Sequence, residues 1–419
     1  MANSPVDRDI LIIGGGIFGA AIAFYLARRG QGKRVQILER GQPAGGATSR
    51  AAALVTLVRD DPAQIHLAQE TFRAIEILER EFGECIGRHT VGALHAAPRS
   101  HADALRARAA HCAAFGIASE WLEDASAHAA AARLAPWLAH EAFDVAVYYP
   151  DECYVEPYLF STAYQRVAGQ LGVNTRLNAD VVAIEHANGQ VSGVRLADGE
   201  FLPARIVINA AGAWANLLSV PTGLPLPMAP VRSQYWISEP AACFPRDGAI
   251  VLLPAIRAYA RPEVGALLFG VREQRPAVAD PRSLPADLAG FVFDENDPDG
   301  WANLAEGAEP LLPYFPRLES LGIAHYLTGP SNYTIDNQLI LGPHPTLSGL
   351  FIASGCNGSG ISFSGGVGRL LAEWVCDEPG LLSPELALGL APGRHGNFDP
   401  YTPEFLAACT FARANKSSG

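Results

Sequence analysis

The chain has 419 residues, enough for two or three domains, and its 49% of hydrophobic residues can build a large buried core. No low-complexity segment is present, so a disordered protein is excluded. Acidic residues outnumber basic ones by 43 to 31, and no basic stripe interrupts this balance. We therefore expect neither a nucleic acid nor an anionic membrane surface as a partner.

Cysteine usage and the first residues indicate the compartment. Seven cysteines are scattered and none has C-x-x-C spacing, which favours reduced thiols over a disulfide framework or a zinc site. Residues 1–8 lack the basic and apolar regions of a signal peptide, and no run of about 18 apolar residues indicates a membrane span. We expect a cytoplasmic protein with no metal site.

Segment 9–39 predicts a strand, a helix and a second strand that together bind a dinucleotide. Gly14, Gly16 and Gly19 follow the G-x-G-x-x-G pattern, and Glu39 stands twenty positions after Gly19. The first glycine permits a tight turn, the second lets a pyrophosphate approach the backbone, and the third lets the helix pack closely. The helix N-terminus presents N–H groups to phosphates, and the carboxylate can bond ribose hydroxyls. A glycine-rich turn that binds nothing is the less favoured alternative.

The following segments predict two interleaved domains. Helices are expected at 63–82 and 157–171, an alanine-rich helical region at 90–145, and strands at 181–184, 191–196 and 205–209. From 221 to about 316, prolines and alternating strands at 233–238, 249–253 and 266–271 indicate a second, mostly antiparallel domain. An apolar strand at 350–353 and a helix at 364–376 follow, and the tail after Asp377 is expected to pack loosely or end in disorder.

Three glycine- and alanine-rich segments narrow the choice of dinucleotide. They are segments 45–53, 206–214 and 355–361. In the first of them, Thr48, Ser49 and Arg50 can bond phosphates and the edge of a ring. The last precedes a helix, whose N-terminal dipole would stabilise the negative charge of a reduced flavin. A nicotinamide enzyme would not need this third segment. Each segment alone could be an ordinary turn, but their joint occurrence in this order favours FAD.

With these motifs, the chain resembles the FAD-dependent amine and amino-acid oxidoreductases of the D-amino-acid oxidase superfamily. Within it, the branch of glycine oxidase, sarcosine oxidase and dimethylglycine dehydrogenase is the most similar. The resemblance runs from about Asp9 to Val375, and its most specific part is N-A-A-G-A-W at 209–214. Segments 150–157 and 230–236 also match.

The resemblance implies an extended FAD, with Val182 near the adenine, and a substrate held between one flavin face and the antiparallel sheet. The implied chemistry is hydride transfer from a C–H beside nitrogen to flavin N5, followed by hydrolysis of the imine. The expected cofactor-binding residues are Gly14, Gly16, Ile17, Phe18, Gly19, Glu39, Arg40, Thr48, Ser49, Arg50, Ala52, Ala53, Val182, Ala211, Gly212, Trp214, Gly355, Asn357, Gly358, Ser359, Gly360 and Ile361.

The chain departs from the family at several positions. Gly329 occupies the place of the cysteine that links FAD covalently in some members, so we expect non-covalent FAD. Ser331 replaces an arginine that clamps a substrate carboxylate, and Ser359 and Ser362 replace a histidine and a lysine. Either the substrate lacks a simple α-carboxylate or another arginine binds it, the candidates being Arg59, Arg257 and Arg261.

The expected catalytic residues are Tyr259, Arg261, Asn332 and Ser359. Tyr259 matches a family tyrosine that faces the substrate, while Arg261 could equally be a solvated cation at a strand edge. Oxidase members use a lysine near the flavin to activate oxygen, and the matching stretch 266–270 has none. This favours a dehydrogenase that passes electrons to a protein or quinone.

We therefore expect an α/β fold with a discontinuous Rossmann-like FAD-binding domain, at 1–90, 150–220 and 320–380. An inserted, mostly antiparallel β-sheet substrate domain would take 91–149 and 221–319, and a C-terminal tail 381–419. The expected function is oxidation of a C–N bond in a small amine or an N-methyl or D-amino acid. Oxidation of a 2-hydroxy acid is one alternative, and a flavoprotein subunit of an electron-transfer complex is another.

Overall fold

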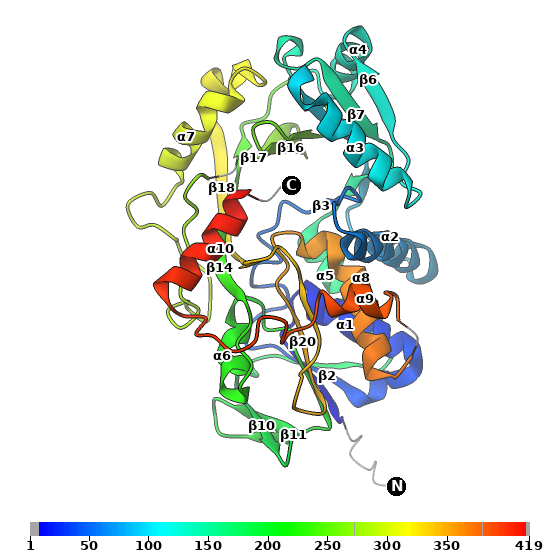
Figure 1. Cartoon of the computed structure of the whole chain (residues 1–419), viewed down its shortest axis with the longest axis vertical. Coiled ribbons are helices and arrows are strands. Elements are labelled where there is room, and N and C mark those ends of the chain that lie inside the picture. Colours follow the sequence, from blue (N-terminus) through cyan, green and yellow to red (C-terminus); the bar gives the residue numbers. More distant parts are fainter. Residues whose placement is uncertain (1–7, 272, 379, 416–419) are drawn as a thin grey trace.

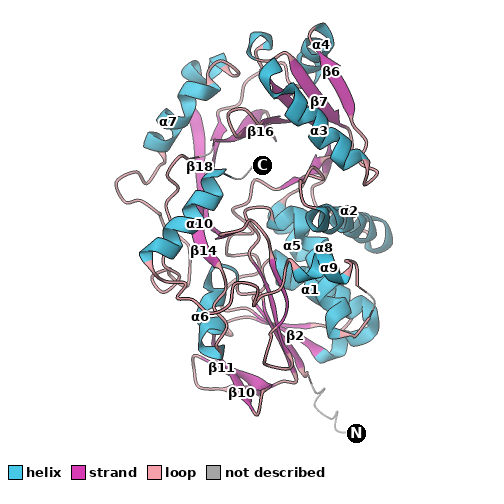
Figure 2. Cartoon of the chain, in the orientation of Figure 1, coloured by secondary structure: helices cyan, strands magenta, loops and turns pink. Residues whose placement is uncertain are grey.

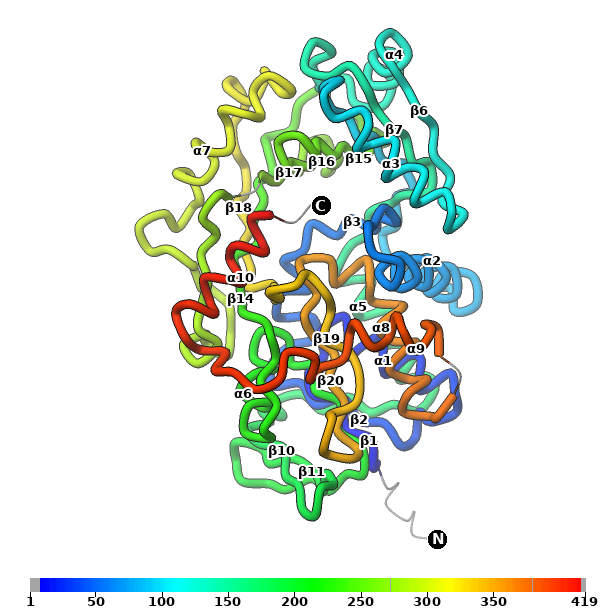
Figure 3. Tube along the Cα trace, viewed as in Figure 1, coloured from blue at the N-terminus to red at the C-terminus, as the bar shows by residue number. Residues whose placement is uncertain are grey.

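The computed structural model describes residues 8–271, 273–378 and 380–415. Two large sheets lie at opposite ends of an elongated molecule, the parallel sheet in the lower half of Figure 1 and a second, larger sheet in the upper half. The chain crosses between them several times (Figure 3), so neither half is one continuous segment.

The lower sheet has six strands in the order β19-β20-β13-β1-β2-β9. Their bounds are β1 Ile10–Ile13, β2 Val35–Leu38, β9 Asn174–Arg176, β13 Ile206–Asn209, β19 Ile340–Pro343 and β20 Leu350–Ser354. All neighbours pair in parallel except β19 and β20. The central strand β1 is apolar and buried along its whole length, as expected for a parallel strand covered on both faces.

Helices α1 (Ile17–Leu26), α2 (Pro62–Phe82), α5 (Pro157–Gln170) and α8 (Gly360–Val375) form a layer beside this sheet (Figure 2). Glycines on α8 allow the close packing. A Cβ at Gly366 would lie 2.3 Å from the Cα of Leu67 on α2, and one at Gly368 would lie 2.7 Å from the backbone of Ala21 on α1. The N-terminal and C-terminal thirds of the chain therefore share one core.

The upper sheet has eight strands in the order β18-β14-β17-β16-β15-β5-β7-β6. Their bounds are β5 Ala93–Ala97, β6 Glu120–Glu123, β7 Val145–Tyr149, β14 Met228–Ser238, β15 Ile250–Leu253, β16 Ala258–Glu263, β17 Ala266–Val271 and β18 Ile323–Thr334. Only β15 and β5 pair in parallel. Helices α3 (Ala102–Ala113), α4 (Ala125–Leu134) and α7 (Trp301–Leu311) lie at this end of the molecule (Figure 1).

Two small sheets and three further α-helices also belong to the described fold. The small sheets are β10 (Val181–Ala187), β11 (Gln190–Leu196) and β12 (Phe201–Pro203), and β3 (Leu54–Val55), β8 (Cys153–Tyr154) and β4 (His89–Thr90). The helices are α6 (Ala215–Ser219), α9 (Pro384–Leu388) and α10 (Pro403–Asn415). No helix in the described ranges is both long and apolar enough to cross a membrane.

The architecture confirms the predicted α/β fold with a separate, mostly antiparallel sheet. Two details differ from the sequence prediction. Strand β18 falls inside the segment assigned to the cofactor-binding domain, yet it pairs with β14 along the edge of the upper sheet. The tail was expected to be loose, but α10 packs on β14 and β18 and buries Cys409 completely. Residues 1–7 and 416–419, about which predictions were also made, lie outside the described ranges.

Candidate functional site

A cavity of about 820 Å³ runs between the two large sheets. It is lined by residues at the carboxyl ends of parallel strands, including Ile13, Leu38 and Ser354. The carboxyl edge is where open α/β sheets bind ligands, because the loops there diverge and helix N-termini point toward the opening. The upper wall is formed by the face of the eight-stranded sheet that includes Ser233 and Tyr259.

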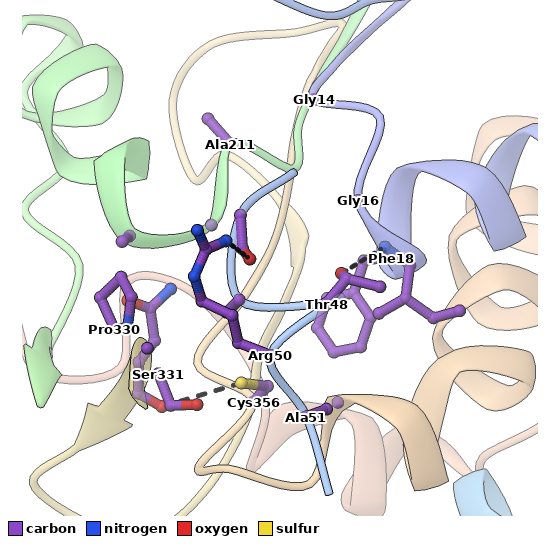
Figure 4. Close-up of a pocket in the computed structure, with 18 of the residues that line it drawn as sticks. Gly14, Gly16, Phe18, Thr48, Arg50, Ala51, Ala211, Pro330, Ser331 and Cys356 are labelled. Carbon is purple, nitrogen blue, oxygen red and sulfur yellow. Dashed lines mark hydrogen bonds between the residues drawn. The ribbon is translucent and has the colours of Figure 1, made fainter. Parts of the chain in front are cut away.

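The turn after β1 provides a phosphate cradle. Gly14 has φ of +104°, and a Cβ there would lie 2.6 Å from the carbonyl oxygen of Ala210, so only glycine fits. Helix α1 follows with Gly16 as its N-cap and no side-chain cap. Thr48 Oγ1 accepts a hydrogen bond from Ile17 N at 3.1 Å (Figure 4), which fixes segment 45–53 against the helix. The helix N-terminus thus faces the cavity with partial positive charge.

At the end of β2, the carboxylate of Glu39 is held by two backbone amides. Its Oε2 accepts from Gly15 N at 2.7 Å and its Oε1 from Gly41 N at 2.8 Å. Beside it, the guanidinium of Arg40 lies 3.8 Å from the ring centroid of Trp214. The indole Nε1 of Trp214 is buried and has no hydrogen-bond partner in the part of the chain that the structure describes. This end of the cavity therefore offers a fixed carboxylate and an unsatisfied donor.

The glycine turn before α8 forms the other end of the groove. Asn357 does not line the cavity; its Oδ1 accepts from Thr334 N at 2.9 Å and from Thr334 Oγ1 at 3.1 Å. This attaches the turn to β18. Helix α8 has Ser359 as its N-cap without a side-chain capping bond, and Ser359 to Ser362 line the cavity. A second helix N-terminus thus points into the same space as α1.

The wall contributed by the upper sheet carries aromatic and small polar groups. Tyr259 on β16 lines the cavity, and a Cβ at Gly270 on β17 would lie 2.4 Å from its ring, so Gly270 makes room for it. Burial raises the pKa of Tyr235, and the neighbouring Tyr259 raises it further. Asn332 donates from Nδ2 to Ser354 Oγ at 3.1 Å, while its buried Oδ1 has no partner.

Most of the predicted residues meet at this cavity. Those that line it are Gly14, Gly16, Ile17, Phe18, Glu39, Arg40, Thr48, Arg50, Ala52, Ala53, Val182, Ala211, Gly212, Trp214, Tyr259, Asn332, Gly355, Gly358, Ser359, Gly360 and Ile361. Those that do not are Gly19, Ser49, Asn357 and Arg261. A Cβ at Gly19 would lie 2.0 Å from the carbonyl oxygen of Gly14, so this glycine serves the packing of α1 against the turn.

Comparison with known proteins decides the family. The model of the FAD dependent oxidoreductase family matches residues 9–374. The chain belongs to this family. Mitochondrial dimethylglycine dehydrogenase of Rattus norvegicus is 28% identical over 99% of this chain and 47% of its own length. The mitochondrial pyruvate dehydrogenase phosphatase regulatory subunit of Mus musculus is 26% identical over 88% of this chain and 42% of its own.

The chain spans less than half the length of these two curated relatives. Among solved structures, glycine oxidase of Geobacillus kaustophilus has 25% sequence identity and a TM-score of 0.74, covering 93% of this chain and 99% of that one. The resemblance drawn from the sequence motifs is thereby confirmed, and FAD is the cofactor of the family.

The described residues fit FAD in three respects. Two helix N-termini whose N-cap residues make no side-chain capping bond face one cavity, which suits a pyrophosphate and an electron-rich ring. The carboxylate of Glu39, fixed by backbone amides, could accept from the hydroxyls of a ribose, and Trp214 Nε1 could donate to an oxygen of the ligand. No group of His, Cys, Asp or Glu that could hold a metal occurs in the part of the chain described.

None of the three arginines proposed to bind a substrate carboxylate lines the cavity. Arg261 donates to Ala52 O and Pro262 O, both at 2.8 Å, and pairs with Glu263 at 2.6 Å. Arg59 is buried behind the cavity and donates to Thr56 Oγ1 and its neighbour's carbonyl, and burial lowers its pKa to about 10. Arg257 bonds the carbonyl of Ala414.

Sequence reasoning missed Ser233, Tyr235 and Arg413 as cavity residues. The first two lie in the matching segment 230–236, where the alternation of a strand would have placed both on one face. Arg413 gives no such signal, because it belongs to the terminal helix that the sequence left unassigned.

Proposed function

We propose that this flavoprotein oxidises the C–N bond of a small amine or N-methyl amino acid. The observation that supports this most is the joint cavity, in which the FAD groove continues into a chamber under the upper sheet. That chamber is walled by Tyr235, Leu252 and Tyr259, a size and character suited to a small substrate. FAD, when bound, accepts the hydride from the carbon beside nitrogen.

The chamber favours a neutral amine, which is the reactive form. The carboxylates lining the cavity are Glu39, Asp180 and Asp287, and all three act electrostatically on Arg40 at the adenine end. The tyrosine wall carries no carboxylate among the lining residues, and the raised pKa of Tyr235 keeps its phenol uncharged. Burial in such surroundings lowers the pKa of a bound ammonium group, so the nitrogen lone pair becomes available.

We further propose that the enzyme acts as a dehydrogenase. The only lysine in the described ranges is Lys33, which is exposed and does not line the cavity. No described ammonium group is therefore placed to attract and polarise oxygen near the flavin. The reduced flavin would then pass its electrons to an acceptor other than oxygen, such as a protein or a quinone.

Anaerobic reduction of the FAD-loaded protein tests the reaction class. N-methylglycine and glycolate form a matched pair, because they differ in the heteroatom on the carbon beside the carboxylate, nitrogen in one and oxygen in the other. We expect the flavin absorbance to bleach with N-methylglycine or a related N-methyl amino acid, and not with glycolate. Bleaching by glycolate alone would establish the hydroxy-acid alternative, and no bleaching by either class would favour the subunit role suggested by the regulatory relative. Rapid peroxide formation in air would contradict the dehydrogenase proposal.

A further inference from the structure

We propose that Arg413, carried into the cavity by the C-terminal helix α10, binds a carboxylate of the substrate. The substrate would then be an amino acid rather than a simple amine. This rests on the proposed function, since it concerns the same chamber. It also assigns a role to a segment beyond residue 374, where the family match ends.

Helix α10 is firmly seated beside the chamber. Cys409 is fully buried and packs in one cluster with Ala229 and Val231 of β14 and with Tyr333 of β18. Arg257, in the turn between β15 and β16, bonds the carbonyl of Ala414 in the last turn of the helix. Figure 1 shows α10 beside β14 and β18, and Arg413 in its last turn lines the cavity. The last turn is therefore held at the edge of the cavity.

The side chain of Arg413 is buried and forms no salt bridge with any residue in the described ranges. It is 7% exposed and lines the cavity, and its Nε has no hydrogen-bond partner among the same residues. Within the described ranges its assigned contact is with the ring of Tyr333, 5.2 Å from the centroid. A cation–π contact offsets only a small part of the cost of burying a guanidinium.

The neighbouring charges leave an excess positive charge. Glu273 is the nearby carboxylate: burial raises its pKa, and the charges of Arg232 and Arg413 act in the opposite direction. Three hydrogen bonds, of 2.6 to 3.1 Å, tie Glu273 to Arg232. Glu273 is thus engaged by Arg232, and no described carboxylate forms a salt bridge with Arg413, so a bound anion would balance its charge.

Other polar groups that line the cavity lie close to Arg413. The hydroxyl of Tyr333 would be 2.2 Å from a Cβ at Gly358, so the ring extends from Arg413 to the turn before α8. Tyr333 Oη lies 3.3 Å from Ser233 Oγ, and Ser331 lines the same wall. An anion beside Arg413 would therefore find hydroxyl groups as further partners. Arg413, on α10, would then supply the positive charge that relatives with an arginine at the position of Ser331 place on the strand.

Acetate and acetamide, titrated into the oxidised FAD-loaded protein and followed by flavin absorbance, measure anion binding directly. We expect acetate to bind more tightly than its uncharged counterpart, and Arg413→Ala to weaken acetate binding by about tenfold or more, since charge-assisted hydrogen bonds are lost. Acetamide binding should stay the same. Arg413→Lys should restore part of the affinity, and Arg133→Ala, an exposed arginine on α4, serves as the control.

Substrate kinetics give a second readout that a merely structural role would not produce. With N,N-dimethylglycine, Arg413→Ala should raise the half-saturating concentration for flavin reduction far more than it lowers the limiting rate. With N,N-dimethylethanolamine, which lacks the carboxylate, wild type and variant should behave alike. FAD content is measured first, so that loss of cofactor is not mistaken for loss of substrate binding.

Equal acetate affinity in wild type and Arg413→Ala at full FAD content would overturn the proposal, as would equal acetate and acetamide affinity in the wild type. Efficient reduction by N,N-dimethylethanolamine alone would also overturn it while leaving amine oxidation intact. If only hydroxy acids reduce the flavin, the proposed function falls, and the acetate titration still decides the role of Arg413.

Discussion

Two glycines have positive φ angles, but only one lies in the turn expected to bind FAD. Replacing each by alanine therefore distinguishes the effect of backbone strain from the effect of a distorted binding turn. Gly14 has φ of +104° and faces the carbonyl of Ala210, whereas exposed Gly30 has φ of +76° and open space around its Cβ position. Gly30→Ala should cost about 1 kcal/mol of stability, from backbone strain alone, and leave FAD affinity unchanged. Gly14→Ala should raise the Kd for FAD by at least about tenfold, because the turn must shift. Fluorescence titration of the apoprotein with FAD measures the Kd of each variant. Equal Kd values for Gly14→Ala and wild type would contradict a role of this turn in holding FAD.

Single residues also underlie the expectation that FAD is bound without a covalent link. A Cβ at Gly329 would lie 3.1 Å from Cβ and Cδ of Arg50, so a cysteine there would crowd this side chain. Figure 4 shows Cys356 in the same region, with its thiol directed at the backbone of β18. We expect acid precipitation of the holoprotein to release all the FAD into the supernatant. Flavin absorbance that stays with the pellet, and is lost in Cys356→Ser, would be the contrary result.

How far the sequence predicts the site depends on whether a residue acts through a local motif. Gly14, Glu39 and Thr48 have tasks set by neighbours in the chain, and the structure brings all three to the cavity. Arg261 shares a face of β16 with Tyr259, but its guanidinium is engaged by the carbonyls of Ala52 and Pro262 and by Glu263, so it does not line the cavity. Arg413 depends on how α10 docks on distant strands, which no local pattern in the sequence encodes.

At the scale of elements, an ion-pair cluster attaches the C-terminal segment to the end of β18. Arg394 donates to both carboxylate oxygens of Asp336, at 2.7 and 3.0 Å, and His395 lies 2.8 Å from Oδ2. Burial raises the pKa of Asp336, but the hydrogen bonds and charge of Arg394 and the bond from His395 outweigh it, so the pKa is about 2. The carboxylate is therefore more acidic in the folded protein than in the unfolded chain.

This depressed pKa predicts how stability varies with pH. The contribution is fully present above the ordinary value of 3.8 and is lost as the pH falls toward about 2. Because the side chain is 26% exposed, we expect Asp336→Asn to cost about 1 kcal/mol at neutral pH. The difference from wild type should shrink below about pH 4, as measured by urea unfolding at each pH. A difference independent of pH would contradict this account; the exposed Asp103→Asn is the control.

Helices and strands were predicted correctly where the hydrophobic residues follow a single periodicity. They were missed or misplaced where contacts with distant segments determine the structure. The stripe on α2 and the apolar run of β1 gave their elements nearly to the residue. Helix α8 begins at Gly360, before the predicted start, because its first turn follows directly from the glycine turn that lines the cavity. Helix α10 has one face seated on β14 and β18, and its weak amphipathic pattern concealed that contact.

At the scale of the whole molecule, the cofactor groove and the chamber exist only because the two sheets face each other. Segments from the start, middle and end of the chain line one cavity, so a ligand spanning it stabilises the complete fold. The order of glycine motifs predicted this convergence. The pairing of β18 with β14 and the return of α10 were not foreseen, since long-range strand pairing leaves little trace in composition.

The most direct test of the central claim is a single-turnover measurement under anaerobic conditions. The FAD-loaded protein is reduced by an N-methyl amino acid, and the carbonyl product and the demethylated amine are quantified against the flavin bleached. Oxidation of a C–N bond predicts about one carbonyl and one amine released per FAD reduced, because the imine hydrolyses in water. Bleached flavin without a carbonyl product, or reduction by hydroxy acids in place of amines, would contradict it.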